Sequence, residues 1–408
     1  MRNKNLWITL SLVNLCVLAL FGLTLRTKFL FSIPFIDYKN LLSAHSHFAF
    51  GGWVTLALAI LYIDQLLTAE QKQKKIYQWI LAGIEFNAFG MLITFPFHGY
   101  ALLSIIFSTL FIFFTYAFSW VFISDLRKVK AEAPVKLLAV SALIFLVISS
   151  IGPFTLAYQM ATKSGSGIMY RNAIYTYLHF QYNGFFTLSV FALFINQFII
   201  AVESATKRRI RYFATLLCLS VIPALFLSLL WRGYNIYLNN LRIAGSVLTI
   251  LTIASFFSFA FQKRIYDKAV PPLARTLLIF SIASFTIKMF LQTGTTIPAL
   301  ANAVFGYRPI IIGFLHLVFL GLVTFYILSN FVSIGVFPGN RFSKMALIYF
   351  SAAVILNEVI LLTDGIGLMF RTTHPVYPWL LWIASMLLFT GALLVLAARL
   401  RRFSNILQ

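Results

Sequence analysis

Histidines are the residues of this sequence best suited to chemistry, because neutral imidazole binds zinc, copper and iron, including heme iron. Four of the six histidines lie in three segments rich in glycine and aromatic residues: His45 and His47, His179, and His316. In each segment a glycine follows a histidine by four to five residues. That is about one helical turn, where a missing side chain would clear space beside the ring for a flat macrocycle. Close helix packing through small residues is the alternative reading.

The first segment contains two histidines, and their spacing limits what both can do. The three segments read SAHSHFAFGGW (43–53), YLHFQYNGFF (177–186) and GFLHLVFLG (313–321). Residues two apart on a helix lie about 200° apart around its axis, so His45 and His47 cannot both ligate one metal ion from a regular helix. One of them is expected to be a ligand, and the other to meet a propionate, a second site or the membrane interface.

The composition places these segments in a lipid bilayer. The chain has 408 residues, of which 61% are hydrophobic and only 10% are charged, whereas soluble domains carry about 25% charged residues. Its net charge of +22 would suggest nucleic acid in a soluble protein, but no polar face is present to form a basic groove. Membrane lipid, and not nucleic acid, is therefore the expected surrounding. Cys16 and Cys218 lie inside apolar runs, which excludes a disulfide framework.

Stretches of about 20 apolar residues are long enough to cross the bilayer as helices. We predict an all-α, polytopic integral membrane protein whose residues 1–408 form a single twelve-helix transmembrane domain. The predicted spans are 6–26, 42–67, 77–98, 100–124, 135–158, 172–202, 211–231, 240–262, 273–293, 308–331, 345–370 and 377–398.

Clusters of basic residues in alternate loops predict the orientation of these spans. They include Arg2 and Lys4 before the first span, the three lysines within residues 72–75 after the second, and the arginines from Arg399 to Arg402 after the last. By the positive-inside rule both termini are expected to be cytoplasmic, in what we predict to be a bacterial inner membrane. All six histidines then fall in the outer half of the membrane or in outer loops. His179 and His316 lie inside spans, where a polar ring is usually functional.

Twelve spans with histidines on the second, sixth and tenth resemble the catalytic subunit of the heme-copper oxidase superfamily, the oxygen and nitric oxide reductases. The resemblance implies a subunit I-like helix bundle. It implies that His316 and either His45 or His47 ligate a low-spin heme, of b type, near the outer face. It implies that His179 takes the place of the sixth-helix ligand to copper or non-heme iron. Arg371 occupies the place of a loop arginine that holds heme propionates.

The sequence departs from this family where a second metal would bind. The family carries two adjacent histidines on its seventh helix, and the corresponding stretch 226–234 has none. Its tenth helix normally carries a His-x-His pair, of which only His316 is present. These differences argue against a second metal and against an intact binuclear oxygen-reducing centre. What the resemblance then implies is a redox protein that transfers electrons from a quinol or a periplasmic cytochrome, or binds nitric oxide or oxygen.

Ionisable residues inside the predicted spans mark a second feature. Glu85, Lys288 and Glu358 lie two or more turns from a span end, where an unpaired charge is costly. They indicate either a proton or quinone path or a structural pairing such as Lys288 with Glu358. At the outer ends, Arg232 and Arg308 could hold propionates beside Arg371 or could be ordinary interface arginines.

Three other functions stay open at this point. Twelve helices are common in secondary carriers, so the histidines, Lys288 and Glu358 could instead line the route of a proton-coupled transporter or channel without heme. His47, His98 and His179 could form a small metal site. The chain could also be a subunit that acts only with a partner. A visible spectrum separates the first of these from the heme protein.

Overall fold

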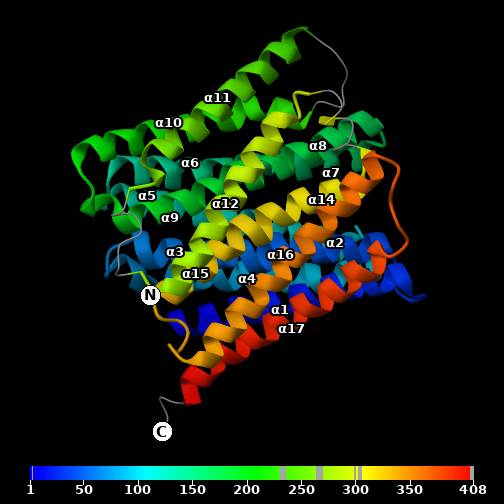
Figure 1. Ribbon diagram of the computed structural model, residues 1–408, viewed down its shortest axis with the longest axis horizontal. Helices are drawn as coiled ribbons and strands as arrows, with labels where there is room; N and C mark the ends of the chain where they lie inside the picture. Colours follow the sequence, from blue (N-terminus) through cyan, green and yellow to red (C-terminus); the bar gives the residue numbers. More distant parts are fainter. Residues whose placement is uncertain (2, 230–235, 263–269, 298–299, 302–305, 405–408) are drawn as a thin grey trace. The chain divides into compact units, whose positions relative to one another are not determined.

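A computed structural model describes residues 1, 3–229, 236–262, 270–297, 300–301 and 306–404. These residues are helical, and no strand occurs among them (Figure 1). Twelve helices are long and apolar enough to cross a membrane, which confirms the predicted number of spans. They cover Lys4–Leu30, Tyr38–Leu66, Lys75–His98, Leu102–Arg127, Ala133–Thr162, Gly167–Ala201, Ser204–Ser228, Asn239–Ala260, Pro272–Gly294, Arg308–Ser333, Arg341–Met369 and Tyr377–Arg402.

The chain divides into two compact units, which are described separately. Unit 1 contains Met1–Phe118, Val270–Ser281 and Tyr307–Gln408, and unit 2 contains Ser119–Ala269 and Ile282–Gly306. Two helices, α5 (Leu102–Arg127) and α12 (Pro272–Gly294), contribute residues to both units. The single domain expected from the sequence stays a prediction.

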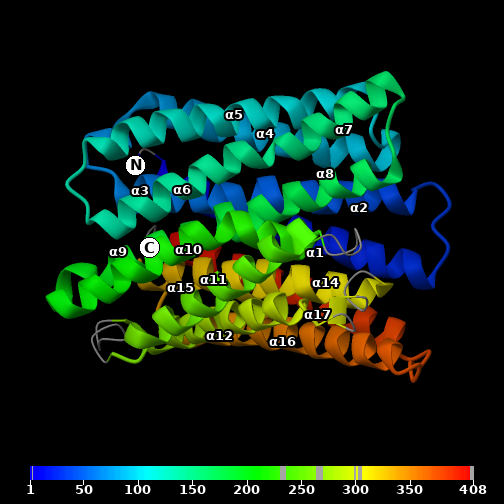
Figure 2. The same cartoon turned by 90° about the horizontal axis from the view of Figure 1, so that it is seen from above.

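Unit 1 holds the first and last helices of the chain. Its elements are α1 (Lys4–Leu30), α2 (Tyr38–Phe48), η1 (Ala49–Thr55), α3 (Leu56–Leu66), α4 (Lys75–His98), α14 (Arg308–His316), η7 (Leu317–Thr324), α15 (Phe325–Ser333), α16 (Arg341–Met369) and α17 (Tyr377–Ser404), with the first part of α5. Helix α17 packs on both α1 and α16, and α2 packs on α4 (Figure 2).

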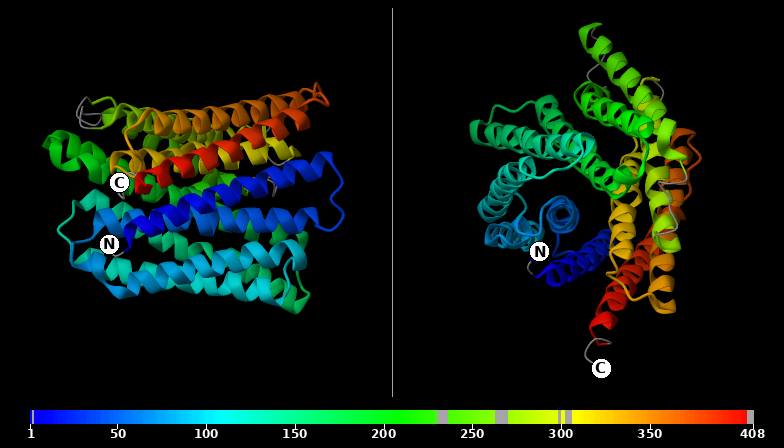
Figure 3. Two further views of the ribbon diagram at one scale, coloured as in Figure 1. Left: turned by 90° about the horizontal axis from the view of Figure 1, so that it is seen from below. Right: turned by 90° about the vertical axis from the view of Figure 1, so that its left-hand side faces the viewer.

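Unit 2 is formed by the middle of the chain. Its elements are α6 (Ala133–Ser149), α7 (Ile151–Thr162), α8 (Gly167–His179), η3 (Phe180–Phe186), α9 (Thr187–Phe198), α10 (Ser204–Ser228) and α11 (Ile236–Ala260), with parts of α5 and α12. Helices α10 and α11 pack side by side, and α6 packs on α9 and η3 (Figures 1 and 3).

Local sequence signals set where several of these helices begin. Asp37 caps α2 because its carboxylate accepts hydrogen bonds from the backbone N–H groups of Lys39 and Asn40. Ser166 caps α8 and Asn340 caps α16 in the same way. These side chains satisfy N–H groups that have no partner within the helix.

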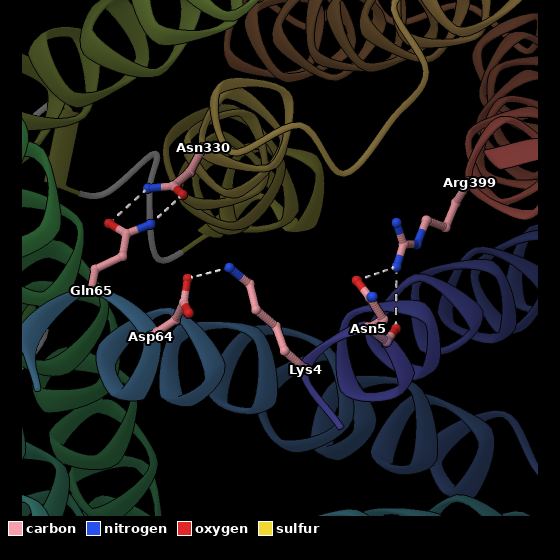
Figure 4. A network of polar contacts seen from close by, with 6 residues as sticks. All are labelled: Lys4, Asn5, Asp64, Gln65, Asn330 and Arg399. Carbon is pink, nitrogen blue, oxygen red and sulfur yellow. Dashed lines mark hydrogen bonds and ion pairs between the residues drawn. The ribbon is translucent and has the colours of Figure 1, made fainter. Parts of the chain in front are cut away.

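Polar contacts fasten the helix ends at one side of unit 1 (Figure 4). Lys4 Nζ lies 2.5 Å from Asp64 Oδ2, which joins α1 to α3. The side-chain amides of Gln65 and Asn330 bond to each other at 2.6 and 3.3 Å. Arg399 of α17 is buried and donates to the Oδ1 of Asn5 at 3.0 Å. The first and last spans are therefore tied together at the ends where the chain starts and finishes.

Candidate functional site

Each span that carries a predicted ligand changes from an α-helix to a π-helix next to its histidine. The segment η1 begins two residues after His47, η3 directly after His179, and η7 directly after His316. Segments of π-helix are rare and occur frequently at functional sites. The three sequence segments thus share a backbone feature as well as a composition.

His45 lies in unit 1 against helix α1. A Cβ atom added to Gly22 would stand 3.3 Å from the Cε1 of His45, so a glycine on α1 allows this close approach. The Nδ1 atom of His45 is buried, and it has no hydrogen-bond partner among the residues that the structure describes. A buried ring nitrogen without a partner is costly, which makes His45 a candidate for binding something else.

His47 faces a different helix and is engaged there. Its Nε2 atom lies 3.0 Å from the hydroxyl of Tyr100, and its ring stacks on Phe95 with centroids 4.7 Å apart and an interplanar angle of 3°. His45 and His47 therefore point to α1 and α4 respectively, as their two-residue spacing predicts.

His316 is held by polar residues of α16. Its Nδ1 atom lies 3.3 Å from the Nδ2 of Asn357 and 3.9 Å from the Oε1 of Glu358. Asn357 also donates to Glu358 at 3.0 Å. The side chains of His316 and Glu358 are 27% and 19% exposed. The ring is thus oriented through Nδ1, and its side chain is incompletely covered.

The helix that ends in His316 differs in burial from the segments that follow it. None of the nine residues of α14 is buried, although its Gly313 lies close to Leu361 of α16. In η7 and α15, by contrast, nearly every residue from Val318 to Phe331 is buried. The chain is therefore less densely packed around its histidine-bearing turn than along the segments that follow it.

Arginines at this end of unit 1 provide positive charge. Arg26 of α1 lies within electrostatic range of both His45 and His316. Arg308 donates to the hydroxyl of Tyr38 at 2.7 Å, and its guanidinium carbon lies 4.8 Å from the centre of that ring. Arg371, the arginine predicted from the resemblance, is exposed in the loop between α16 and α17 with a φ of 56°.

Sequence reasoning missed Arg26, although a signal was present. Arg26 and Lys28 stand at the predicted outer end of the first span, where the alternation of basic clusters leads one to expect few positive charges. Arg232, which was grouped with Arg308, lies outside the described residues.

Two of the glycines that follow the histidines lie against phenylalanine side chains. A Cβ atom on Gly51 would stand 2.8 Å from the ring of Phe111, and one on Gly184 would stand 2.5 Å from the Cβ of Phe145. These glycines make room for phenylalanine side chains and not for a macrocycle. Close helix packing, the alternative reading, therefore explains both positions. The glycine that meets a histidine ring is Gly22, on another helix.

Glu85 is buried in unit 1 and connects to the π segment η1. Both of its carboxyl oxygens accept from the side-chain amide of Asn14, at 2.9 and 3.0 Å. The same amide nitrogen donates to the carbonyl of Gly52 at 2.6 Å. Asn14 was not singled out from the sequence, and it links Glu85 to the backbone that follows His45 and His47.

His179 lies in unit 2 and has both ring nitrogens occupied. Nε2 lies 2.7 Å from the carbonyl of Val221, and Nδ1 lies 3.0 Å from the Nδ2 of Asn183 and 3.1 Å from the hydroxyl of Ser228. Asn183 in turn accepts a hydrogen bond from Lys288. In this arrangement His179 presents no free nitrogen to a metal, and its predicted role as a ligand stays a prediction.

The remaining histidines lie at the surface of the chain. His98 ends α4 and His374 lies in the loop before α17, and both are exposed. Within the described part of the chain, no three or more His, Cys, Asp or Glu side chains gather as a metal-binding group. A small metal site built from His47, His98 and His179 therefore gains no support.

No protein-family model and no curated protein matches this chain.

Proposed function

We propose that this protein is an integral membrane redox protein that binds one heme between His45 and His316. The observation that carries the proposal is the environment of these two imidazoles in unit 1. One has a buried nitrogen without a partner, and the other is oriented through Nδ1 with an incompletely covered ring. His45 lies within electrostatic range of His316, as two residues near a common ligand would.

The surroundings of His316 suit a metal ligand. A histidine that binds a metal through one nitrogen almost always has the other nitrogen held by a carboxylate, a carbonyl or a water, which fixes the orientation of the ring. Two polar side chains stand at Nδ1 of His316: Asn357, whose NH₂ group faces the ring, and Glu358, whose carboxyl oxygen lies 3.9 Å away. The other nitrogen, Nε2, is then the one offered to iron.

The contacts of the two second-span histidines favour His45 over His47. Each ring makes a hydrogen bond, His45 to the backbone of Leu18 and His47 to the hydroxyl of Tyr100. The His47 ring is also stacked on Phe95, whereas Nδ1 of His45 has no partner in the described chain. His45 lies on the α1 side, where Arg26 also stands. Arg26 and Arg308 would hold the two propionates, a role that the exposed Arg371 is less well placed to fill.

A heme with two histidine ligands supplies one-electron transfer at an iron without an open coordination position. The residues of this chain would bind the group, fix the ring of His316 and neutralise the propionate charge. A quinol or a periplasmic cytochrome would be the electron donor, at the side of the bacterial inner membrane that faces away from the cytoplasmic termini. Binding of nitric oxide or oxygen would require His45 to leave the iron. A second metal at His179 is not part of this proposal.

The visible spectrum of the purified protein tests the proposal. A low-spin heme gives sharp bands on reduction, and we expect His316→Ala and His45→Ala to abolish them while His47→Ala keeps them. A wild-type protein without these bands, purified from cells supplied with heme precursors, would favour the carrier or channel. Bands that survive in His316→Ala would overturn the ligand assignment. Equal loss in His45→Ala and His47→Ala would indicate damage to the fold of α2, which thermal unfolding of the two variants would detect.

A further inference from the structure

Unit 2 contains a small internal cavity next to the predicted sixth-span ligand. It lies between η3, α10, α11 and α12, and five of its lining side chains are polar. The lining residues are Asn183, Leu217, Ser220, Val221, Ala224, Thr249, Lys288, Met289 and Gln292. The cavity therefore differs from the dry voids of apolar cores, which are lined by hydrocarbon side chains.

Lys288 is the charged residue of this cavity, and it is 1% exposed. Its Nζ donates to the Oδ1 of Asn183 and lies 3.6 Å from the Sδ of Met289. No carboxylate of the described chain lies within ion-pair distance of it. A lysine nitrogen can make three hydrogen bonds, and a neutral amide and a weak thioether contact leave it incompletely satisfied.

The hydrogen bonds around Asn183 have a fixed direction. Lys288 donates to the oxygen of the Asn183 amide, so the NH₂ group of that amide faces the Nδ1 of His179. Nδ1 is therefore the acceptor, and Nε2 carries the hydrogen that His179 donates to the carbonyl of Val221. Lys288 thus orients the Asn183 amide, and this amide determines which nitrogen of His179 carries the hydrogen.

Three other side-chain oxygens of the cavity lining can accept hydrogen bonds. Ser220 donates its hydroxyl hydrogen to the carbonyl of Leu217, and Thr249 donates to that of Gly245. Their oxygens turn lone pairs to the cavity. Gln292 is 7% exposed, and its Oε1 has no partner within the described part of the chain. A water here could accept from the lysine nitrogen and donate to two of the three oxygens, which gives it three of the two to four polar partners that a buried water needs.

We propose that this cavity holds one exchangeable water, and that this water carries protons to and from Lys288. The proton moves between Nζ and the water oxygen, so that ammonium and water become amine and hydronium, while the hydrogen bond to Asn183 keeps the nitrogen in place. Of the titratable groups on the surrounding elements, His179 connects to Lys288 through Asn183. Tyr182, Cys218 and Arg242 belong to η3, α10 and α11 and do not line the cavity. The proposal does not depend on the heme of unit 1.

Water-edited solid-state NMR of the protein in bilayers, labelled with ¹⁵N at the lysine Nζ, tests this inference. Lys288→Gln assigns the signal by removing it, and Lys288→Arg does the same if the glutamine variant fails to fold. In the wild type we expect magnetisation to be transferred from water to the Lys288 signal. In Gln292→Leu we expect the rate of this transfer to fall at least threefold. Leu217→Met is the matched control, because it changes an apolar lining residue whose side chain makes no polar contact with Lys288, and it should leave the rate unchanged.

Two results would overturn the proposal: a Lys288 signal that receives no magnetisation from water in the wild type, or a rate in Gln292→Leu equal to that of the wild type. Both can be read whether or not the protein contains heme, so they are distinguishable from a failure of the proposed redox function.

Discussion

Asn357 places its side-chain amide 3.3 Å from the Nδ1 of His316, between that ring and Glu358. As drawn, the NH₂ group faces Nδ1, which then carries no hydrogen. A ligand that binds iron through Nε2 carries a hydrogen on Nδ1 and needs an acceptor there. The amide satisfies that requirement when it is turned by 180°. Its oxygen then also faces Oε1 of Glu358, so the turned amide requires a protonated Glu358 that donates to it. Asn357 can therefore serve both the free and the ligating imidazole.

We expect Asn357→Leu to lower heme affinity by about 10- to 100-fold, the usual effect of removing a residue that orients a metal ligand. Asn357→Asp supplies an oxygen at the same place and should keep most of the affinity. The measurement is the heme-to-protein ratio at limiting heme. Val359→Ala, which changes an exposed side chain of the same helix, is the control. Unchanged affinity in Asn357→Leu would show that His316 needs no partner at Nδ1.

The positive charge near the histidines predicts which arginines would hold the propionates of the proposed heme. Arg26→Gln and Arg308→Gln should each lower heme content severalfold at limiting heme, because each removes a positive charge that would pair with a propionate. Arg371→Gln should leave heme content near the wild-type level, since Arg371 is exposed in its loop. The opposite order, with the largest loss of heme in Arg371→Gln, would indicate that the loop residue Arg371 binds the propionates. It would contradict the role given to Arg26.

His47→Phe separates the two histidines of α2. A phenylalanine keeps the stacking contact with Phe95 but removes the bond to the Tyr100 hydroxyl. We expect the heme bands to remain and the free energy of unfolding to fall by about 0.5–1.5 kcal/mol, the net value of one hydrogen bond. Tyr100→Phe should give the same loss of stability, and the double variant should lose little more, because both changes remove one interaction. Absence of heme in His47→Phe would make His47 the ligand.

The hydrogen bonds between Asn14 and Glu85 predict that substitutions at these two residues of unit 1 have non-additive effects on stability. Asn14→Leu leaves the carboxyl of Glu85 and the carbonyl of Gly52 without this donor, which should cost roughly 1–3 kcal/mol of unfolding free energy. Adding Glu85→Leu removes the stranded carboxyl, so the double variant should be more stable than the sum of the two single losses predicts. Thermal unfolding in detergent measures all three. Strictly additive losses would mean that Asn14 and Glu85 do not act as a pair.

The number and approximate limits of the spans could be predicted because bilayer thickness fixes the length of an apolar helix. The predicted span 77–98 corresponds to Lys75–His98, and 308–331 to Arg308–Ser333. The divergence of His45 and His47 followed from helical periodicity alone. These features depend on composition and spacing, which the sequence contains directly.

The contacts of the candidate site could not be predicted, because they depend on which helices become neighbours. Nothing in the spacing indicates that Gly22 of α1 meets His45 or that Asn14 meets Glu85. The π segments could not be predicted either. They differ from an α-helix only in the spacing of their backbone hydrogen bonds, and they have no distinct composition. The sequence could not decide between a cofactor and helix packing at Gly51 and Gly184, because the phenylalanines that fill their space come from other helices.

The tight packing of Gly184 leads to a last prediction. An added methyl group would stand 2.5 Å from the Cβ of Phe145, an atom fixed to the backbone of α6 that cannot turn away. Gly184→Ala should therefore force η3 and α6 apart and cost about 1–3 kcal/mol, as overpacking of a dense core usually does. Gly167→Ala is the matched control, because nothing lies within 4 Å of its added Cβ. Thermal unfolding of the two variants compares them, and equal stability would mean that η3 and α6 do not pack this closely.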